Sequence, residues 1–230
     1  QAGNTQEAND SIEYRAPIAG ELTASPAIVR DGNNITFTYT GSVGLNATIN
    51  TTELQRLDNT STKDIALLDD GVGSDSVAND GVYTGNYSIS SLNNVSDGIK
   101  RLTGAVNDTE GNVLRPAVNI TLDNTRPNAT VSIFGLSPAG FADVSTEYTF
   151  SRAVTLVIGF NDTTSNVDSC RFSNENLAFT GWEVCQTAKA WLLSDANGNK
   201  TVVVEVRDLD GNVNRTNDTI FFNVTGAGLD

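Results

Sequence analysis

Two stretches of the sequence decide the fold. Residues 105–115 read Ala-Val-Asn-Asp-Thr-Glu-Gly-Asn-Val-Leu-Arg, and residues 205–215 read Glu-Val-Arg-Asp-Leu-Asp-Gly-Asn-Val-Asn-Arg. At an offset of 100 residues, Val, Asp, Gly, Asn, Val and Arg coincide. Each stretch is typical of a β-hairpin, because an apolar strand is followed by an Asp-X-X-Gly-Asn turn, with glycine where φ must be positive, and by a second strand. The repeat therefore predicts two similar β-domains in tandem.

Short strands are expected outward from both hairpins, among them strands over 22–29, 113–122 and 181–185. Apolar residues alternate with polar ones at Ile35, Phe37 and Tyr39 and again along 202–206, which is the period of a half-buried strand. No helical stripe of useful length is present. A domain of about 100 residues with this pattern has the size and strand pattern expected of an immunoglobulin-like β-sandwich. We expect an all-β chain with an N-terminal extension (1–20), a first sandwich (21–124) and a second sandwich (125–230), joined just before Pro127.

The composition excludes several function classes. The 230 residues include 14 basic and 28 acidic side chains, a net charge of −14, which does not suit a nucleic-acid partner. The absence of histidine removes Ser-His-Asp and Cys-His catalysis and His-ligated metals, so we expect no enzyme. No apolar run reaches the length of a membrane span. The N-terminus lacks a signal-peptide pattern, so we expect Gln1 to begin a processed chain.

Two cysteines, Cys170 and Cys185, lie in a strand–turn–strand pattern. Their spacing suits a disulfide across a hairpin in an oxidising compartment, the alternative being two free buried thiols.

The sequence is dense in acceptors for N-glycosylation. It has 26 Asn and 45 Ser or Thr, which would give about five Asn-X-Ser/Thr sequons by chance and about ten if pleat alternation pairs them on exposed faces. The 15 observed sequons exceed both values and predict covalent N-glycans on an extracellular or cell-surface protein. They begin at Asn9, Asn34, Asn46, Asn50, Asn59, Asn86, Asn94, Asn107, Asn119, Asn128, Asn161, Asn199, Asn214, Asn217 and Asn223.

Two segments carry a family resemblance. Residues 67–84 read Leu-Leu-Asp-Asp-Gly-Val-Gly-Ser-Asp-Ser-Val-Ala-Asn-Asp-Gly-Val-Tyr-Thr, and residues 165–173 (Ser-Asn-Val-Asp-Ser-Cys-Arg-Phe-Ser) are followed by Trp182, 189–193 and 200–208. Over roughly residues 21–224 the chain resembles the immunoglobulin-like or fibronectin-III-like repeats of prokaryotic surface-layer, adhesin and filament proteins. The resemblance implies a β-sandwich fold and an extracellular setting, and it leaves the function open. The cysteine pair departs from the pattern of such repeats, and the sequon density suggests an archaeal source.

The acidic loop is the first candidate for a metal site. Oxygen ligands spaced around glycines suit Ca²⁺, so Asp69, Asp70, Asp75 and Asp80 are candidate calcium ligands, and Asp208 and Asp210 are weaker candidates. The spacing does not match an EF-hand, and Asp and Asn also cap turns without metal.

Two tryptophans are candidates for sugar binding. Trp182 and Trp191 could form a sugar platform, but a tryptophan in a sandwich more often fills the core, and we expect that role for both.

The N-terminal segment is the strongest functional hint. Ile12, Tyr14, Ala16 and Ile18 fall on one face of a strand-like segment. Such a strand could complete the sheet of another copy (donor-strand exchange), pack on its own domain, or remain a disordered tail.

Donor-strand exchange would make the chain a subunit of a glycosylated, pilus-like extracellular filament whose partners are copies of itself and, in some cases, other surface proteins. The alternatives are a surface adhesin or sugar-binding module and a calcium-dependent surface-layer component.

Overall fold

The computed structural model describes residues 17–54, 64–89, 95–135 and 146–224. In these ranges every regular element is a strand apart from one short 3-10 helix, η1 (Thr52–Leu54). The prediction of an all-β chain built from β-sandwiches is therefore confirmed.

The first sandwich consists of two facing sheets. The smaller sheet has the order β1 (Glu21–Ser25), β3 (Asn34–Thr40) and β6 (Val82–Ser88). The larger sheet has the order β2 (Ile28–Val29), β9 (Ala117–Leu122), β7 (Gly98–Asn107), β4 (Asn46–Asn50) and β5 (Asp64–Leu67), and β8 (Val113–Leu114) pairs with β7.

The second sandwich repeats this topology. Its smaller sheet runs β10 (Asn128–Phe134), β12 (Ala153–Asn161) and β14 (Ala188–Leu192). Its larger sheet runs β11 (Tyr148–Thr149), β16 (Val213–Phe222), β15 (Gly198–Asp208) and β13 (Val167–Asn174). Both sandwiches thus begin with a strand in the small sheet, followed by a short strand that pairs in parallel in the large sheet.

Each sandwich buries its own core. Ile35, Phe37 and Tyr39 on β3 are fully buried, as are alternate valines on β15, so the period-2 pattern marks the inward faces. The two clusters of buried residues share no member, which makes each sandwich a separate packing unit.

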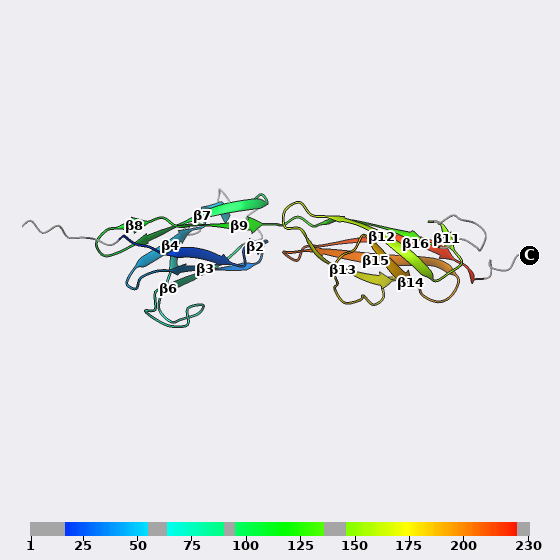
Figure 1. Ribbon diagram of the computed structural model, residues 1–230, viewed down its shortest axis with the longest axis horizontal. Helices are drawn as coiled ribbons and strands as arrows, with labels where there is room; N and C mark the ends of the chain where they lie inside the picture. Colours follow the sequence, from blue (N-terminus) through cyan, green and yellow to red (C-terminus); the bar gives the residue numbers. More distant parts are fainter. Residues whose placement is uncertain (1–16, 55–63, 90–94, 136–145, 225–230) are drawn as a thin grey trace, which may run out of the picture.

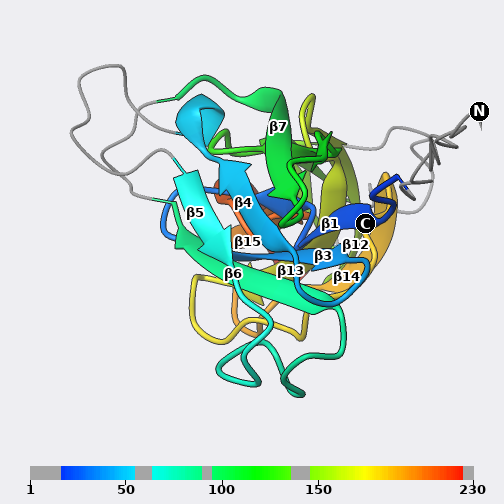
Figure 2. The same ribbon diagram turned by 90° about the vertical axis from the view of Figure 1, so that its left-hand side faces the viewer.

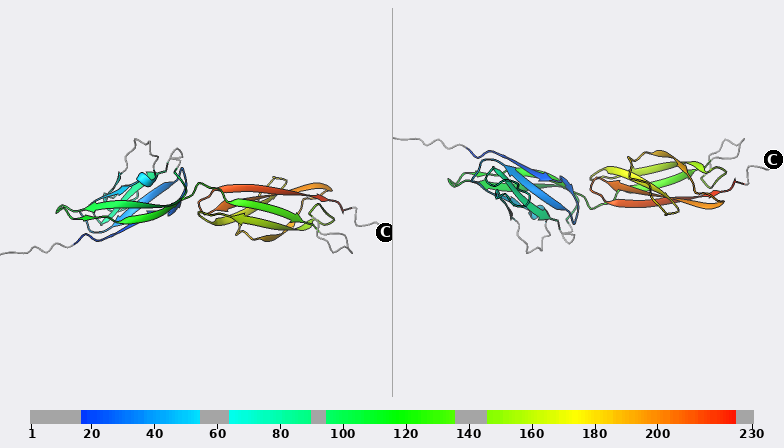
Figure 3. Two further views of the ribbon diagram at one scale, coloured as in Figure 1. Left: turned by 90° about the horizontal axis from the view of Figure 1, so that it is seen from above. Right: turned by 90° about the horizontal axis from the view of Figure 1, so that it is seen from below.

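The two sandwiches lie end to end. In Figure 1 the hairpin of β7 and β8 lies at the end of the first sandwich that faces away from the second, whereas β9 leads into the junction. The two views in Figure 3 show the same extended arrangement. Viewed along the long axis, the connection from β5 to β6 projects sideways from the first sandwich (Figure 2).

The two repeated hairpins have matching backbones. Gly111 and Gly211 have φ values of +85° and +84°, the left-handed conformation that favours glycine at this point of the turn. The hairpin prediction is correct in both sandwiches.

Several strand boundaries differ from the sequence prediction. The strand expected over 22–29 is divided into β1 and β2 at Pro26, and the strand expected over 113–122 is divided at Pro116, since proline lacks the N–H that a ladder needs. The short strand β11 was missed. The strand expected over 181–185 is wrong: this segment makes one isolated bridge, between Glu183 and Cys170, so no ladder forms along it.

Candidate functional site at the domain junction

The turn that the repeat encodes is held by one aspartate in each sandwich. In the second sandwich, Oδ1 of Asp208 accepts hydrogen bonds from the backbone N–H groups of Asp210 (3.0 Å) and Asn212 (2.8 Å). Its Oδ2 accepts one from the side chain of Asn212 (2.9 Å). Asp108 makes the same three bonds in the first sandwich, to Glu110 and Asn112. The turn therefore has the same shape in both places.

Only the Asp208 turn lies against the other sandwich. Arg30, directly after β2, donates from Nη1 to the carbonyl oxygen of Gly211 (3.1 Å) and to Oδ1 of Asn212 (3.2 Å). Asn212 in turn donates to the backbone carbonyl of Asp123 in the linker (3.0 Å). These bonds fix the hairpin of the second sandwich to the end of the first.

Three aspartates converge at this junction. Asp123 follows β9 in the first sandwich, Asp162 follows β12 and Asp208 ends β15. One carboxylate oxygen from each lies within 4.8 Å of the others. Asp123 and Asp208 are 0% and 1% exposed, so two of the three carboxyl groups are withdrawn from water.

Part of this acidic junction lacks hydrogen-bond partners. Oδ2 of Asp123 and Oγ of Ser165 are buried and have no partner of good geometry, and Ser165 is 2% exposed. Oδ2 of Asp210, beside them in the turn, is also buried without a partner. Buried polar atoms normally find a partner, so unpartnered ones in a group call for a physical explanation.

Burial acts on the electrostatics of the same group. It raises the pKa of Asp123 above its ordinary value, an effect that the nearby Ser165 hydroxyl and the Thr125 backbone N–H only partly oppose. Burial likewise raises the pKa of Asp210 to about 7, opposed by the guanidinium of Arg30 and supported by the charge of Asp208. The junction therefore gathers carboxyl groups in a buried place where their ionised forms are disfavoured.

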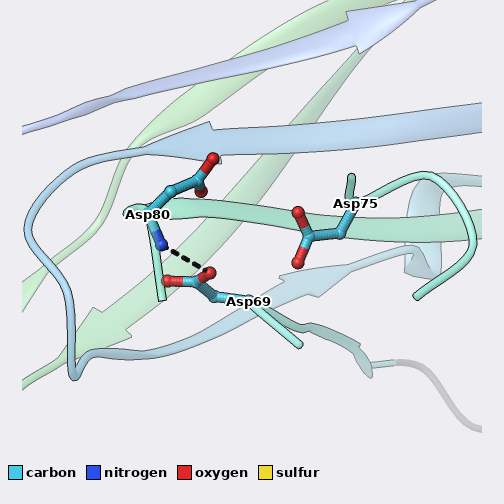
Figure 4. A group of neighbouring side chains, drawn as sticks. All are labelled: Asp69, Asp75 and Asp80. Atoms are coloured by element: carbon cyan, nitrogen blue, oxygen red, sulfur yellow. Dashed lines mark hydrogen bonds between the residues drawn. The ribbon is translucent and has the colours of Figure 1, made fainter. Parts of the chain in front are cut away.

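The acidic loop of the first sandwich is organised differently. Oxygens of Asp69, Asp75 and Asp80 lie within 4.8 Å of one another, and Asp70 is not part of this group. Figure 4 shows the bond that Asp69 accepts from the backbone N–H of Asp80, at 3.1 Å. Asp75 accepts bonds from Gly71 (2.6 Å) and Val77 (3.2 Å), and these bonds hold its pKa below the ordinary value.

These carboxylates therefore shape the loop themselves, as turn-capping aspartates do. A calcium ion at this loop stays a prediction.

Sequence reasoning identified part of the junction. It named Asp208 and Asp210 as a weaker acidic pair but missed Asp123, Asp162 and Ser165. The available signal was that Asp123 follows the last strand of one domain and Asp208 lies in the repeated turn of the next, so the strand directions bring them together.

The disulfide prediction is confirmed. Cys170 on β13 is bonded to Cys185 with a Cα–Cα distance of 5.1 Å. In the same region, Glu183 exchanges both backbone hydrogen bonds with Cys170, and the Thr180 backbone N–H donates to Phe172 (2.8 Å). The segment 180–185 thus covers one edge of β13. In the first sandwich the strand that corresponds to β13 is β4, and the same edge of β4 pairs with β5.

The core prediction for the tryptophans is correct for one of the two. Trp191 packs on the second core and donates from Nε1 to Asn174 (2.7 Å). Trp182 is not part of that core. Its ring centroid lies 4.5 Å from the guanidinium carbon of Arg171 and 4.5 Å from that of Arg207.

These two arginines are fixed in turn by Glu205 and Asp168. Since the guanidinium groups lie against the Trp182 ring, a sugar stacking on the covered part of the ring would have to displace an arginine.

The predicted glycosylation sites are distributed over both sandwiches. Asn9, Asn59 and Asn94 lie outside the described residues. Among the described sites, Asn214 is the least suited, because its Nδ2 atom donates to the carbonyl of Pro127 (2.8 Å) at the junction. The exposed sites are Asn34, Asn46, Asn86, Asn119, Asn128, Asn161, Asn199 and Asn217.

Most of the predicted donor strand also lies outside the described residues, including Ile12, Tyr14 and Ala16. Ile18 is described, and it packs half-buried against the core of its own sandwich. For this residue the arrangement is that of self-packing.

Within the described ranges, no helix is long and apolar enough to span a membrane. No protein-family model matches the sequence, and no curated protein matches it. Solved structures with a similar arrangement include the fibronectin(III)-like modules of Clostridium thermocellum CbhA, at 14% identity and a TM-score of 0.39, covering 88% of this chain and 93% of that chain.

Two further structures overlap over most of this chain. A 1.5-MDa bacterial ice-binding adhesin is 16% identical with a TM-score of 0.48, covering 90% of this chain. Three N-terminal domains of the bacteriophage RB49 outer capsid protein Hoc are 14% identical with a TM-score of 0.45, covering 89%. The chain spans 64% and 59% of these two structures, respectively.

Proposed function

We propose that this chain is a structural, non-enzymatic segment of an extracellular surface assembly, in which two sandwiches held end to end act as a spacer. The observation that supports it most directly is the junction, where Arg30 and Asn212 hydrogen-bond across the two sandwiches and hold them in line. A disulfide, an acidic surface and many exposed sequons suit an oxidising, solvent-rich setting outside the cell.

The spacer function makes a specific prediction about shape in solution. Small-angle X-ray scattering of the whole chain should give the pair-distance distribution of an elongated particle, with a maximum dimension about twice that of one sandwich. A compact particle, with the sandwiches folded side by side, would contradict the proposal.

Within this class we propose assembly into a filament by strand donation from the N-terminal segment. Its alternating residues support this proposal, whereas the packing of Ile18 on its own sandwich supports the alternative of self-packing. The described strands form complete sheets without a gap, so a donated strand would add to an edge rather than fill a groove.

Deletion of residues 1–16 tests assembly, since it leaves Ile18 and the first core intact. Electron microscopy should show fibres for the full chain and single rods for the truncated chain. Fibres that persist without residues 1–16 would rule out strand donation while leaving the spacer function untouched.

A further inference from the structure

We propose that the acidic junction is a binding site for a hard divalent cation, calcium by its ligand set, held by the carboxylates of Asp123, Asp162 and Asp208 with the hydroxyl of Ser165. The site joins both sandwiches, because Asp123 follows the last strand of the first and the other ligands belong to the second. This site is separate from the acidic loop that the sequence singled out.

The geometry is that of a partly assembled coordination shell. The three carboxylate oxygens lie within 4.8 Å of one another, close to the spacing at which one ion between them makes the 2.3–2.6 Å bonds typical of Ca²⁺ and oxygen. A carboxylate oxygen offers two lone pairs. Oδ1 of Asp208 uses both in accepting the backbone N–H groups of Asp210 and Asn212, whereas Oδ2 accepts one bond from Asn212 and keeps a lone pair for the ion.

Unpartnered atoms supply the independent observation. Oδ2 of Asp123 belongs to a fully buried side chain and accepts no hydrogen bond of good geometry. The hydroxyl of Ser165 lies near enough to lower the pKa of Asp123, but it is itself buried without a well-formed hydrogen bond. Ser165 is held by its backbone N–H, which donates to Oδ1 of Asp162 (2.8 Å) and thus ties the serine to a second ligand. A buried carboxylate oxygen without a donor is costly unless a cation takes the donor's place.

The ligand chemistry favours calcium over other metals. All four side chains offer hard oxygen, and thiolates and imidazoles are absent, because the sequence has no histidine and both cysteines are in the disulfide. Calcium accepts six to eight ligands in an irregular cage, whereas magnesium requires a near-ideal octahedron and retains water. A loop-built group with an unpartnered carboxylate oxygen and hydroxyl suits the former.

The acidic loop at Asp69, Asp75 and Asp80 provides a built-in comparison. There the carboxylates accept backbone N–H groups within the loop, and no buried side-chain oxygen of these three residues is left without a partner. The two groups have similar spacing but differ in unsatisfied oxygens, so we assign the stronger site to the junction.

Binding would stiffen the rod, because an ion shared by Asp123 and the two aspartates of the second sandwich opposes bending at the linker. This consequence rests on the proposed spacer function, whereas the cation site itself does not.

Calorimetric titration of the whole, metal-stripped chain with CaCl2 tests the site. We expect a junction site in the range of about 0.1 to 1 mM, as in extracellular modules, and weaker binding of MgCl2. D123N/D162N should weaken this site by about tenfold or more, since two charged ligands are lost. D69N/D80N removes two carboxylates from the other acidic group and should leave the junction site unchanged.

A second variant keeps the test decisive if D123N/D162N does not fold. D162N alone retains the side-chain oxygen that Thr164 and Ser165 donate to, and should still weaken calcium binding. Unchanged calcium binding in a folded D162N or D123N/D162N, or loss of all binding in D69N/D80N, would overturn the proposal.

X-ray scattering with calcium and with chelator separates the two proposals. An elongated particle that becomes more flexible in chelator supports both. A rod that binds no calcium overturns the cation site alone, and a compact particle that binds calcium overturns the spacer function alone.

Discussion

At the scale of single residues, Asp108 and Asp208 form the same turn in different surroundings. Asp208 lies at the junction. Asp108 belongs to neither acidic group and directly follows β7, in the β7–β8 hairpin, which lies at the far end of the first sandwich (Figure 1). Hydrogen bonds from the side chain and backbone of Asn112 hold the pKa of Asp108 below its ordinary value of 3.8. Its ionised form therefore stabilises the first sandwich.

This shift predicts a pH dependence. A depressed pKa contributes stability above the ordinary value of 3.8, and that contribution is lost as the pH falls through the lower pKa of the folded state. D108N should lower the melting temperature of the first sandwich at pH 7. It should also reduce the further decrease in melting temperature below pH 4.

Thermal unfolding between pH 7 and pH 2 measures this effect. E53Q removes an exposed carboxylate of the same sandwich and serves as the control. Equal acid profiles for D108N and the wild type would show that Asp108 contributes nothing to acid unfolding.

At the scale of elements, the second sandwich has an irregular, disulfide-linked segment where the first sandwich has the edge strand β5. In the first sandwich the edge strand β5 pairs with β4. In the second sandwich β13 corresponds to β4, and its edge is covered by residues 180–185, to which the disulfide links it. Covering an edge in this way prevents its pairing with another chain.

The disulfide should therefore dominate the stability of this element. Closing a loop of 15 residues contributes about 3 kcal/mol in the chain-entropy model, so C170A/C185A should lower the melting temperature of the second sandwich by about 10–20 °C. Scanning calorimetry should show the transition of the first sandwich unchanged, which provides an internal control. A second-sandwich transition within about 2 °C of the wild type would contradict this role.

At the scale of the whole molecule, the junction chemistry is present at only one of the described ends. The parallel pair Val29–Leu122 corresponds to Thr149–Phe222 in the second sandwich, so Phe150 stands where Arg30 does and Asn223 where Asp123 does. The C-terminal end of the second sandwich therefore cannot reproduce the contacts of Arg30 and Asp123.

Removal of the arginine tests how the junction holds its shape. R30A deletes both hydrogen bonds from Nη1 and a positive charge beside the aspartates. We expect a broader distribution of domain orientations by X-ray scattering, with both sandwiches still folded. R126A, which removes an exposed arginine from the same linker, is the matched control and should leave the distribution unchanged. Equal flexibility of the two variants would show that Arg30 does not hold the junction.

The sequence by itself predicted most of the strands, the repeated hairpins and, with free thiols as the alternative, the disulfide. These depend on local physics, because side-chain alternation, a glycine at positive φ and two cysteines in a strand–turn–strand pattern act within a few residues of each other. The buried face of β3 and the turn at Gly211 could therefore be predicted from the residues.

Only the tertiary structure decided what these elements bring together. Asp123, Asp162 and Asp208 are dozens of residues apart, and they meet because three strands end at the same junction. Trp182 is a large aromatic residue of the kind that fills cores. Its segment lies along the edge of β13, so its ring packs against Arg171 and Arg207 instead. Which turn of an identical pair contacts the other sandwich depends on the direction of the strands, and no local pattern encodes it.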